Sequence, residues 1–223
     1  MVLSIRKSVS EDSVESAEQN VGALQTVGVL FFLRCIMMRG SVVLIDGGYL
    51  KVLLKSSFGE PKVDFAKFSS IIASDGQSKL IRTYYYYCLP FLSSSPSDED
   101  RKRHDAAQRF LNKLRMIDRF EVVIGKLELR GFSTNGEPIL VQKRVDIALA
   151  VTLVRLSYSQ SIDTFHLVAG DSDFIPAVEA AKDQGKSVIL WHSEDSTYHK
   201  DLWQVCDERH KIDQQLIDKC IRD

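Results

Sequence analysis

The sequence predicts an α/β fold in which helices cover both faces of a mostly parallel sheet. After the N-terminal stretch, strand-like and helix-like segments alternate, an order typical of such sheets. Two apolar runs also end in acids: residues 42–45 precede Asp46, and residues 165–169 lead through a glycine to Asp171. Open parallel sheets bind ligands at the carboxyl ends of their strands, so these runs also indicate where a site lies.

The first half of the chain is predicted to form a strand at 42–45, helices at 49–54 and 64–73, and a strand at 81–88. Gly47 and Gly48 are interpreted as turn residues. The fourth segment, IRTYYYYC, is rich in aromatic and β-branched residues that suit a strand. Alternation should turn two tyrosine rings to each face, where most belong to the core; the end nearest Cys88 is the best place for base stacking.

The second half begins with LSSSPSDEDRKRH, residues 92–104, which is predicted to be a polar loop. We interpret its basic trio, Arg101 to Arg103, as a solvated surface. The remaining segments are predicted to be a helix around 110–117, the extended runs FEVVIGKLEL and PILVQK joined by a hairpin, a long helix from Asp146, a strand ending at Ala169, a helix to Gln184, and a strand from Ser187.

Composition indicates one compact soluble domain, because the 223 residues are 44% hydrophobic and 26% charged. The formal net charge of −1 excludes an overall polybasic protein, and the four scattered cysteines lack CxxC spacing, which argues against a zinc or disulfide framework. We expect a cytoplasmic protein. No membrane association is predicted, because the apolar run at 27–38 contains Arg34 and is shorter than the roughly 20 residues of a spanning helix.

The predicted domain boundary separates an accessory N-terminal extension, residues 1–37, from a single domain at 38–223 that ends in a helical tail. Acids precede the apolar run of the extension, an order that does not fit a signal peptide. Met37 or Met38 is a candidate natural start.

Four aspartates are the candidate site. Asp46 follows the first strand, Asp171 and Asp173 follow the strand at 165–169, and Asp146 lies in the first turn of the long helix. Each acid, like Ser172, has a simpler interpretation as a helix cap or turn residue. Their common position at one edge of a sheet favours a shared site. Clustered carboxylates repel one another unless a cation joins them, and oxygen ligands without Cys or His favour Mg²⁺ or Mn²⁺.

The segments IDGGYL, KRVDIALAVTLVRL and HLVAGDSDFIPAVEAAKDQGKSVIL, in this order, resemble the NYN family of PIN-like nuclease domains, including its LabA-like branch. The resemblance runs from about Val42 to Trp191. It implies a three-layer α/β/α PIN-like domain and a metal-dependent ribonuclease whose acids correspond to Asp46, Asp146, Asp171 and Asp173. Two positions depart from the family pattern: Tyr49 stands where an asparagine is common, and Arg144 where a glycine is common.

The predicted function is a metal-dependent endoribonuclease that hydrolyses the phosphodiester bonds of single-stranded RNA. A bound metal ion would activate water and neutralise charge on the leaving oxygen. The residues expected to contact RNA are Lys51, Lys143, Arg144 and Ser172. The oligomeric state is open, with a homodimer among the options.

Two alternatives stay open at this point. The first is a non-catalytic RNA-binding or regulatory module, in which the departures at Tyr49 and Arg144 have weakened the chemistry. The second is a phosphatase or receiver-like protein, in which Asp46 would become covalently phosphorylated during phosphoryl transfer. The sequence near Asp46 contains no lysine or second-aspartate motif that supports the latter.

Overall fold

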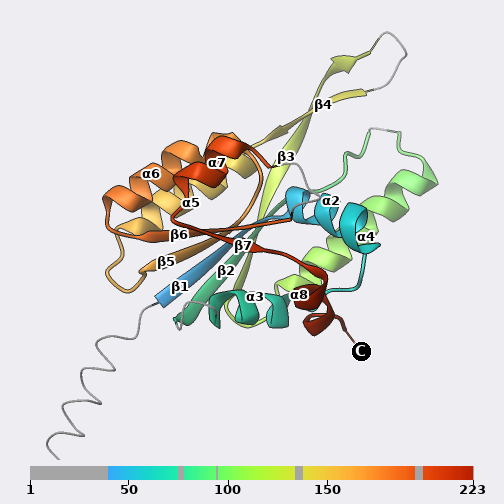
Figure 1. Ribbon diagram of the computed structural model, residues 1–223. Helices are drawn as coiled ribbons and strands as arrows, with labels where there is room; N and C mark the ends of the chain where they lie inside the picture. Colours follow the sequence, from blue (N-terminus) through green and yellow to red (C-terminus); the bar gives the residue numbers. More distant parts are fainter. Residues whose placement is uncertain (1–39, 75–77, 94, 134–137, 194–197, 223) are drawn as a thin grey trace, which may run out of the picture. The chain divides into compact units, whose positions relative to one another are not determined.

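The computed structural model describes residues 40–74, 78–93, 95–133, 138–193 and 198–222 (Figure 1). They form a seven-stranded sheet in the order β4-β3-β2-β1-β5-β6-β7. The strands are β1 Gly40–Asp46, β2 Lys79–Cys88, β3 Phe120–Phe132, β4 Pro138–Lys143, β5 Thr164–Val168, β6 Ser187–His192 and β7 Glu208–Lys211. Among the described strands of this sheet only the β3–β4 pair is antiparallel, which confirms both the mostly parallel sheet and the hairpin.

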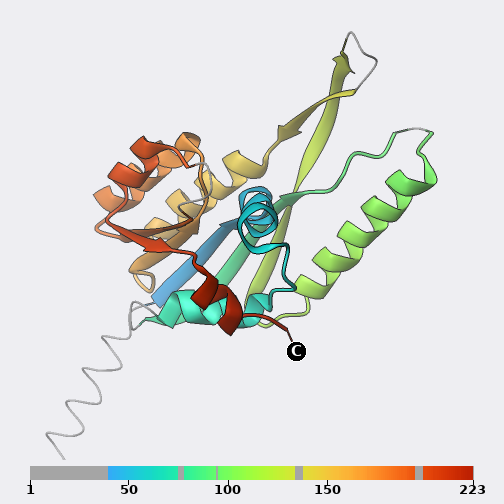
Figure 2. The same cartoon turned by 45° about the vertical axis from the view of Figure 1, so that its right-hand side comes forward.

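Helices cover both faces of this sheet and complete the three-layer α/β/α architecture (Figures 1 and 2). The first layer contains α2 Gly47–Phe58, α3 Phe65–Ser74, α4 Asp98–Leu114 and α8 Gln214–Lys219. The second contains α5 Val145–Ser157, α6 Ile175–Asp183, with the short 3-10 helix η1 Ser172–Phe174 before it, and α7 Lys200–Val205.

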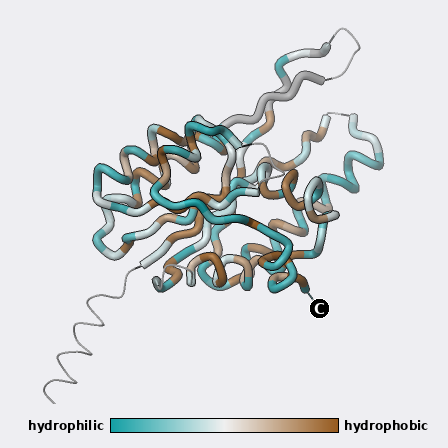
Figure 3. The backbone as a smooth tube through the Cα atoms, in the orientation of Figure 1, coloured by the Kyte–Doolittle hydropathy of each residue, from teal (hydrophilic) through white to brown (hydrophobic). Residues whose placement is uncertain are grey.

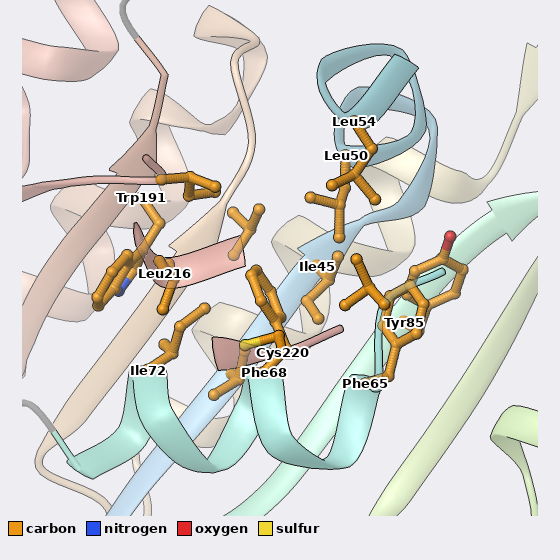
Figure 4. Packing of buried hydrophobic residues seen from close by; sticks show 14 of the residues in the cluster. Ile45, Leu50, Leu54, Phe65, Phe68, Ile72, Tyr85, Trp191, Leu216 and Cys220 are labelled. Carbon is orange, nitrogen blue, oxygen red and sulfur yellow. The ribbon is translucent and has the colours of Figure 1, made fainter. Parts of the chain in front are cut away.

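The two cores of the fold follow from the alternation of side chains along buried strands. Val43 and Ile45 face the α2–α3–α4–α8 layer, whereas Val42 and Leu44 face the α5–α6–α7 layer, and all four are 0% exposed. Figure 4 shows Leu50 and Leu54 pointing from α2 toward the sheet. Burial of each large apolar side chain stabilises the fold by about 1.5–3 kcal/mol, so β1 anchors both layers.

The tyrosine run on β2 divides between the two faces as predicted. Tyr84 and Tyr86 belong to the core beneath α5 and α6, and their ring centroids lie 6.4 Å apart. Tyr85 and Tyr87 lie on the opposite face, with ring centroids 6.2 Å apart. The predicted split of two rings to each side is therefore confirmed.

The predicted polar loop at 92–104 was wrong from Asp98 onward, because α4 begins there. Ser97 and Asp100 form a capping box: the Ser97 hydroxyl accepts a hydrogen bond from the Asp100 amide, and the Asp100 carboxylate accepts one from the Ser97 amide. This reciprocal pair stabilises the start of a helix whose first turns are hydrophilic, as Figure 3 shows. The helix ends at Leu114, before Met116.

Two smaller expectations also need correction. Gly47 and Gly48 are the first residues of α2 rather than turn residues. The C-terminal tail is not purely helical, because β7 adds an edge strand beside β6. The sequence of β7, ERHK, lacks the apolar alternation that would have indicated a strand.

The predicted N-terminal extension, residues 1–37, lies outside the described residues, so its boundary stays a prediction. Among the helices that are described, none is both long and apolar enough to cross a bilayer.

Candidate functional site

The candidate site lies where the strand order of the sheet changes direction. From β1 the chain proceeds to β2 and β3 on one side, and later to β5 and β6 on the other. Ile45 of β1 pairs with Val168 of β5, and the chain reaches Asp46 directly after the first and Asp171 three residues after the second. Ligands of open α/β sheets bind outside the carboxyl ends of strands at such a switch point.

Asp46 ends β1 and caps α2. Its Oδ1 accepts hydrogen bonds from the amides of Gly48, at 2.8 Å, and Tyr49, at 3.2 Å. Burial raises the pKa of the Asp46 carboxyl, these two hydrogen bonds oppose the shift, and the nearby charges of Asp146 and Asp171 add to it. The fold thus holds a carboxylate where its ionised form is disfavoured.

Asp146 lies in the first turn of α5, as predicted, and its side chain is half-buried. Burial raises the pKa of the Asp146 carboxyl, and the charges of Asp171 and Asp173 raise it further. Asp171 therefore acts on the ionisation of both Asp46 and Asp146. Acids from three separate segments of the chain come close enough for their charges to interact.

Asp171 and Asp173 are exposed and occupy the turn between β5 and α6. Oδ1 of Asp171 accepts a hydrogen bond from the Asp173 amide at 3.0 Å, so Asp171 caps the 3-10 helix η1. Pro176 stands at the start of α6. The capping and shared-site interpretations of the sequence are therefore compatible, since Asp46 and Asp171 cap helices and also lie at one edge.

The acids fit a hard divalent cation in their chemistry, although they do not form a closed cage. Within the described part of the chain, no three His, Cys, Asp or Glu residues converge closely enough to hold a metal ion by themselves. Mg²⁺ commonly keeps several waters and takes only one or two carboxylates directly. Burial and mutual repulsion at Asp46 and Asp146 are what such a cation would relieve.

The residues expected to contact RNA have different surroundings. Lys51 is exposed on α2, and its Nζ donates a hydrogen bond to the Tyr87 hydroxyl at 3.2 Å. Arg144 is exposed and precedes α5, while Ser172 is half-buried in η1. Lys143 ends β4, but its side chain lies outside the described part.

The backbone at Arg144 explains why a glycine suits this position. Arg144 has φ 77° and ψ −15°, in the left-handed region, and no side chain caps α5 there. A residue with a Cβ pays roughly 1–2 kcal/mol for this conformation, whereas glycine does not. Where the family commonly has glycine, this chain therefore has a strained arginine two residues before Asp146.

Sequence reasoning missed the role of Tyr85, whose ring lies against α2 beside the acids. A Cβ added to Gly47 would lie 2.5 Å from Cζ of Tyr85, so only glycine allows this close approach. Burial is the main cause that raises the pKa of the Tyr85 hydroxyl, and the charge of Asp46 adds to it. The alternation of the strand predicted that the four tyrosine rings divide between the two faces, but not that α2 would pack on Tyr85.

Comparisons with known proteins identify a sequence relative and a shared fold. The chain aligns over 127 residues, at 28% identity, with an uncharacterized protein of Methanocaldococcus jannaschii; the match covers 49% of this chain and about half, 52%, of that relative. A crystal structure of a protein of unknown function from Vibrio parahaemolyticus shares the fold, with a TM-score of 0.57 at 18% identity over 83% of this chain and 97% of that one.

The family assignment rests on a family model that matches more than half of the chain. The model of the NYN domain matches residues 41–213, which include all four candidate aspartates. Assignment to the LabA-like branch stays a prediction. NYN domains are part of the PIN-like nuclease superfamily, and this chain belongs to the NYN domain family.

Proposed function

We propose that this NYN domain is a metal-dependent endoribonuclease that acts on single-stranded RNA. The observation that carries the proposal is that Asp46, Asp146 and Asp171 come from three segments to the switch point of the sheet, where burial raises the pKa of Asp46 and of Asp146 and the charge of Asp171 raises both further. A bound Mg²⁺ or Mn²⁺ would polarise the phosphate and lower the pKa of a water.

In this proposal the residues of the chain have separate tasks. Asp46, Asp146 and Asp171 hold the cation, one or two of them directly and the rest through its bound waters, and Asp173 either joins them or orients the attacking water. Asp46 is fixed by its two amide hydrogen bonds, and a carboxylate retains a second oxygen for a ligand. Lys51 and Arg144, both exposed near these acids, are proposed with Lys143 and Ser172 to hold the RNA backbone.

The test is cleavage of labelled RNA with Mg²⁺ or Mn²⁺, with and without EDTA. Cleavage should require the cation and should fall at least about 100-fold in Asp146→Asn and Asp171→Asn, since a metal supplies several kcal/mol of charge stabilisation. Asp183→Asn, an exposed carboxylate at the end of α6, is the matched control. Full cleavage by both site variants, shown to be folded by circular dichroism, would defeat the assignment.

A second candidate is a non-catalytic RNA-binding module. It is favoured by the strained Arg144 and by the absence, within the described part, of three metal-ligand side chains already in contact distance. RNA binding that EDTA does not change, without any cleavage, would support this candidate over the nuclease.

A further inference from the structure

A pocket of about 470 Å³ lies between α2 and α4, near the carboxyl end of β2. Its volume falls within the range of small-molecule sites. Four aromatic residues contribute to its lining: Phe65, Tyr85, Tyr87 and Phe110. Figures 1 and 2 place α2 and α4 on the same side of the sheet, and Figure 4 shows Tyr85 next to Phe65 and below Leu54.

The rings of the pocket support one another in a fixed arrangement. Tyr85 lies edge to face with Phe65, at 5.5 Å between centroids, and with Phe110, at 6.0 Å. Phe110 also contacts Phe65 at 5.6 Å and is 37% exposed. A partly exposed ring on a rigid aromatic base is a surface on which a planar ligand can stack without reorganisation.

Charge around the pocket selects the kind of planar ligand. Its charged lining residues are four cations, Lys51, Lys62, Arg103 and Arg222, and one acid, Glu60. Nζ of Lys51 is hydrogen-bonded to the Tyr87 hydroxyl and lies 5.9 Å from the centre of that ring. A ligand that combines an aromatic plane with negative charge fits this lining, and a nucleotide has both.

The pocket and the acidic edge are physically joined through α2. Asp46 caps this helix, and Leu50, which lines the pocket, follows four residues later, or about 6 Å along the axis. Tyr85 contributes to the pocket and also packs against Gly47. A single-stranded nucleic acid bound at the acids would therefore pass within reach of the pocket.

We propose that this pocket holds one unstacked base of a single-stranded nucleic acid, while Lys51 and Arg103 contact the adjoining phosphates. The inference rests on the proposed function, since it identifies which part of the bound strand is recognised beside the site of cleavage. It assigns phosphate binding to Arg103, which the sequence analysis interpreted, with its two basic neighbours, as a solvated surface.

The experiment measures binding by calorimetry in EDTA, with the full chain, a short oligouridine and an abasic strand of equal length. The wild type should bind oligouridine about tenfold more tightly than the abasic strand, because stacking on an aromatic side chain contributes about 1–3 kcal/mol per base. Phe110→Ala should remove this preference and Phe110→Tyr should retain it. Met116→Ala, which alters an exposed residue just beyond α4, should have no effect.

A second pair of variants tests the phosphate contact. Arg103→Gln should weaken binding of both strands and reduce the salt dependence of log Kd by about one unit of slope, whereas Arg101→Gln, which does not line the pocket, should do neither. The proposal is overturned if the wild type binds neither strand or both equally, or if the Phe110 and Arg103 variants behave like their controls.

Because no metal is present, these results are independent of catalysis. Base preference without cleavage in the separate metal-dependent assay would retain the pocket and refute the nuclease. Cleavage without base preference would do the reverse.

Discussion

Tyr84 and Tyr86 lie on one face of β2, and Tyr85 and Tyr87 lie on the other, where the helices leave a pocket beside them. Beneath α5 and α6 the tyrosines join a continuous core in which Phe165 and Leu149 are fully buried. On the opposite face, α2 and α4 leave the aromatic pocket of about 470 Å³. We infer that beside these tyrosines the face beneath α5 is closed and supplies stability, whereas the face between α2 and α4 is open there and leaves aromatic surface beside the acids for a ligand.

The largest expected difference between the faces is in unfolding free energy. Phe165→Ala, in the closed core, should destabilise the protein by about 3–5 kcal/mol, because it removes a fully buried ring and leaves a cavity. Phe110→Ala, on the open face, should cost only about 1 kcal/mol, mainly from its ring contacts. Urea denaturation followed by circular dichroism measures both values. Equal losses would contradict the division between the faces.

The next effect concerns Asp46, which lies at the edge where the two faces meet. Asp46→Asn should stabilise the metal-free protein at pH 7 by about 0.5–2 kcal/mol, the usual range for one stabilising substitution. Asparagine still caps α2 and removes a charge that burial disfavours. Lost activity together with increased stability would mark Asp46 as a residue kept for function.

The sign of the pH dependence follows from the raised pKa of Asp46. Folding favours the protonated carboxyl, so the stability of the wild type should fall as the pH rises from the ordinary value of 3.8 through the raised pKa. The advantage of Asp46→Asn should therefore be present at pH 7 and vanish below about pH 3.8. Thermal melts in EDTA across this range measure it. Mg²⁺ should stabilise the wild type more than the variant, and an advantage of Asp46→Asn that is independent of pH would contradict the raised pKa of Asp46.

The position of the acids was predictable from sequence because it depends on local features. An apolar strand followed by aspartate fixes Asp46 and Asp171 at carboxyl ends, and any parallel sheet brings such ends to the same edge. The capping box was also recognisable in the sequence, because Ser97 is followed three residues later by the acid Asp100. It was missed because the charge and serine content of the segment were given more weight than its spacing.

The pocket was not predictable, because it depends on contacts between distant segments. Phe110 contacts Tyr85, and Arg103 lines the same pocket, because of the angle at which α4 packs, whereas Arg222 comes from near the C-terminus. The left-handed backbone at Arg144 was not predictable from the sequence either, because its φ depends on how the β3–β4 hairpin and α5 are positioned.

A smaller effect is expected at the start of α4, the helix that forms one wall of the pocket. Ser97→Ala should cost about 1 kcal/mol, because the amide of Asp100 loses its acceptor. Ser97→Thr should retain most of the stability. Hydrogen exchange should show the increased opening in the first turns of α4 and leave α5 unchanged. Faster exchange spread over both helices would indicate that the two layers do not respond separately.

The smallest effect is expected at Arg144, where α5 begins on the closed face without a side-chain cap. Arg144→Gly should stabilise the protein by about 0.5 kcal/mol, because relief of roughly 1–2 kcal/mol of left-handed strain exceeds the 0.5–1 kcal/mol entropic cost of glycine. Arg144→Ala retains the Cβ and should leave the stability unchanged, so the pair separates backbone strain from the loss of the guanidinium. If both variants bind RNA equally weakly while only the glycine variant is more stable, Arg144 contributes charge to the site at the expense of the helix start. A glycine variant no more stable than alanine would show that the backbone at this position relaxes in solution.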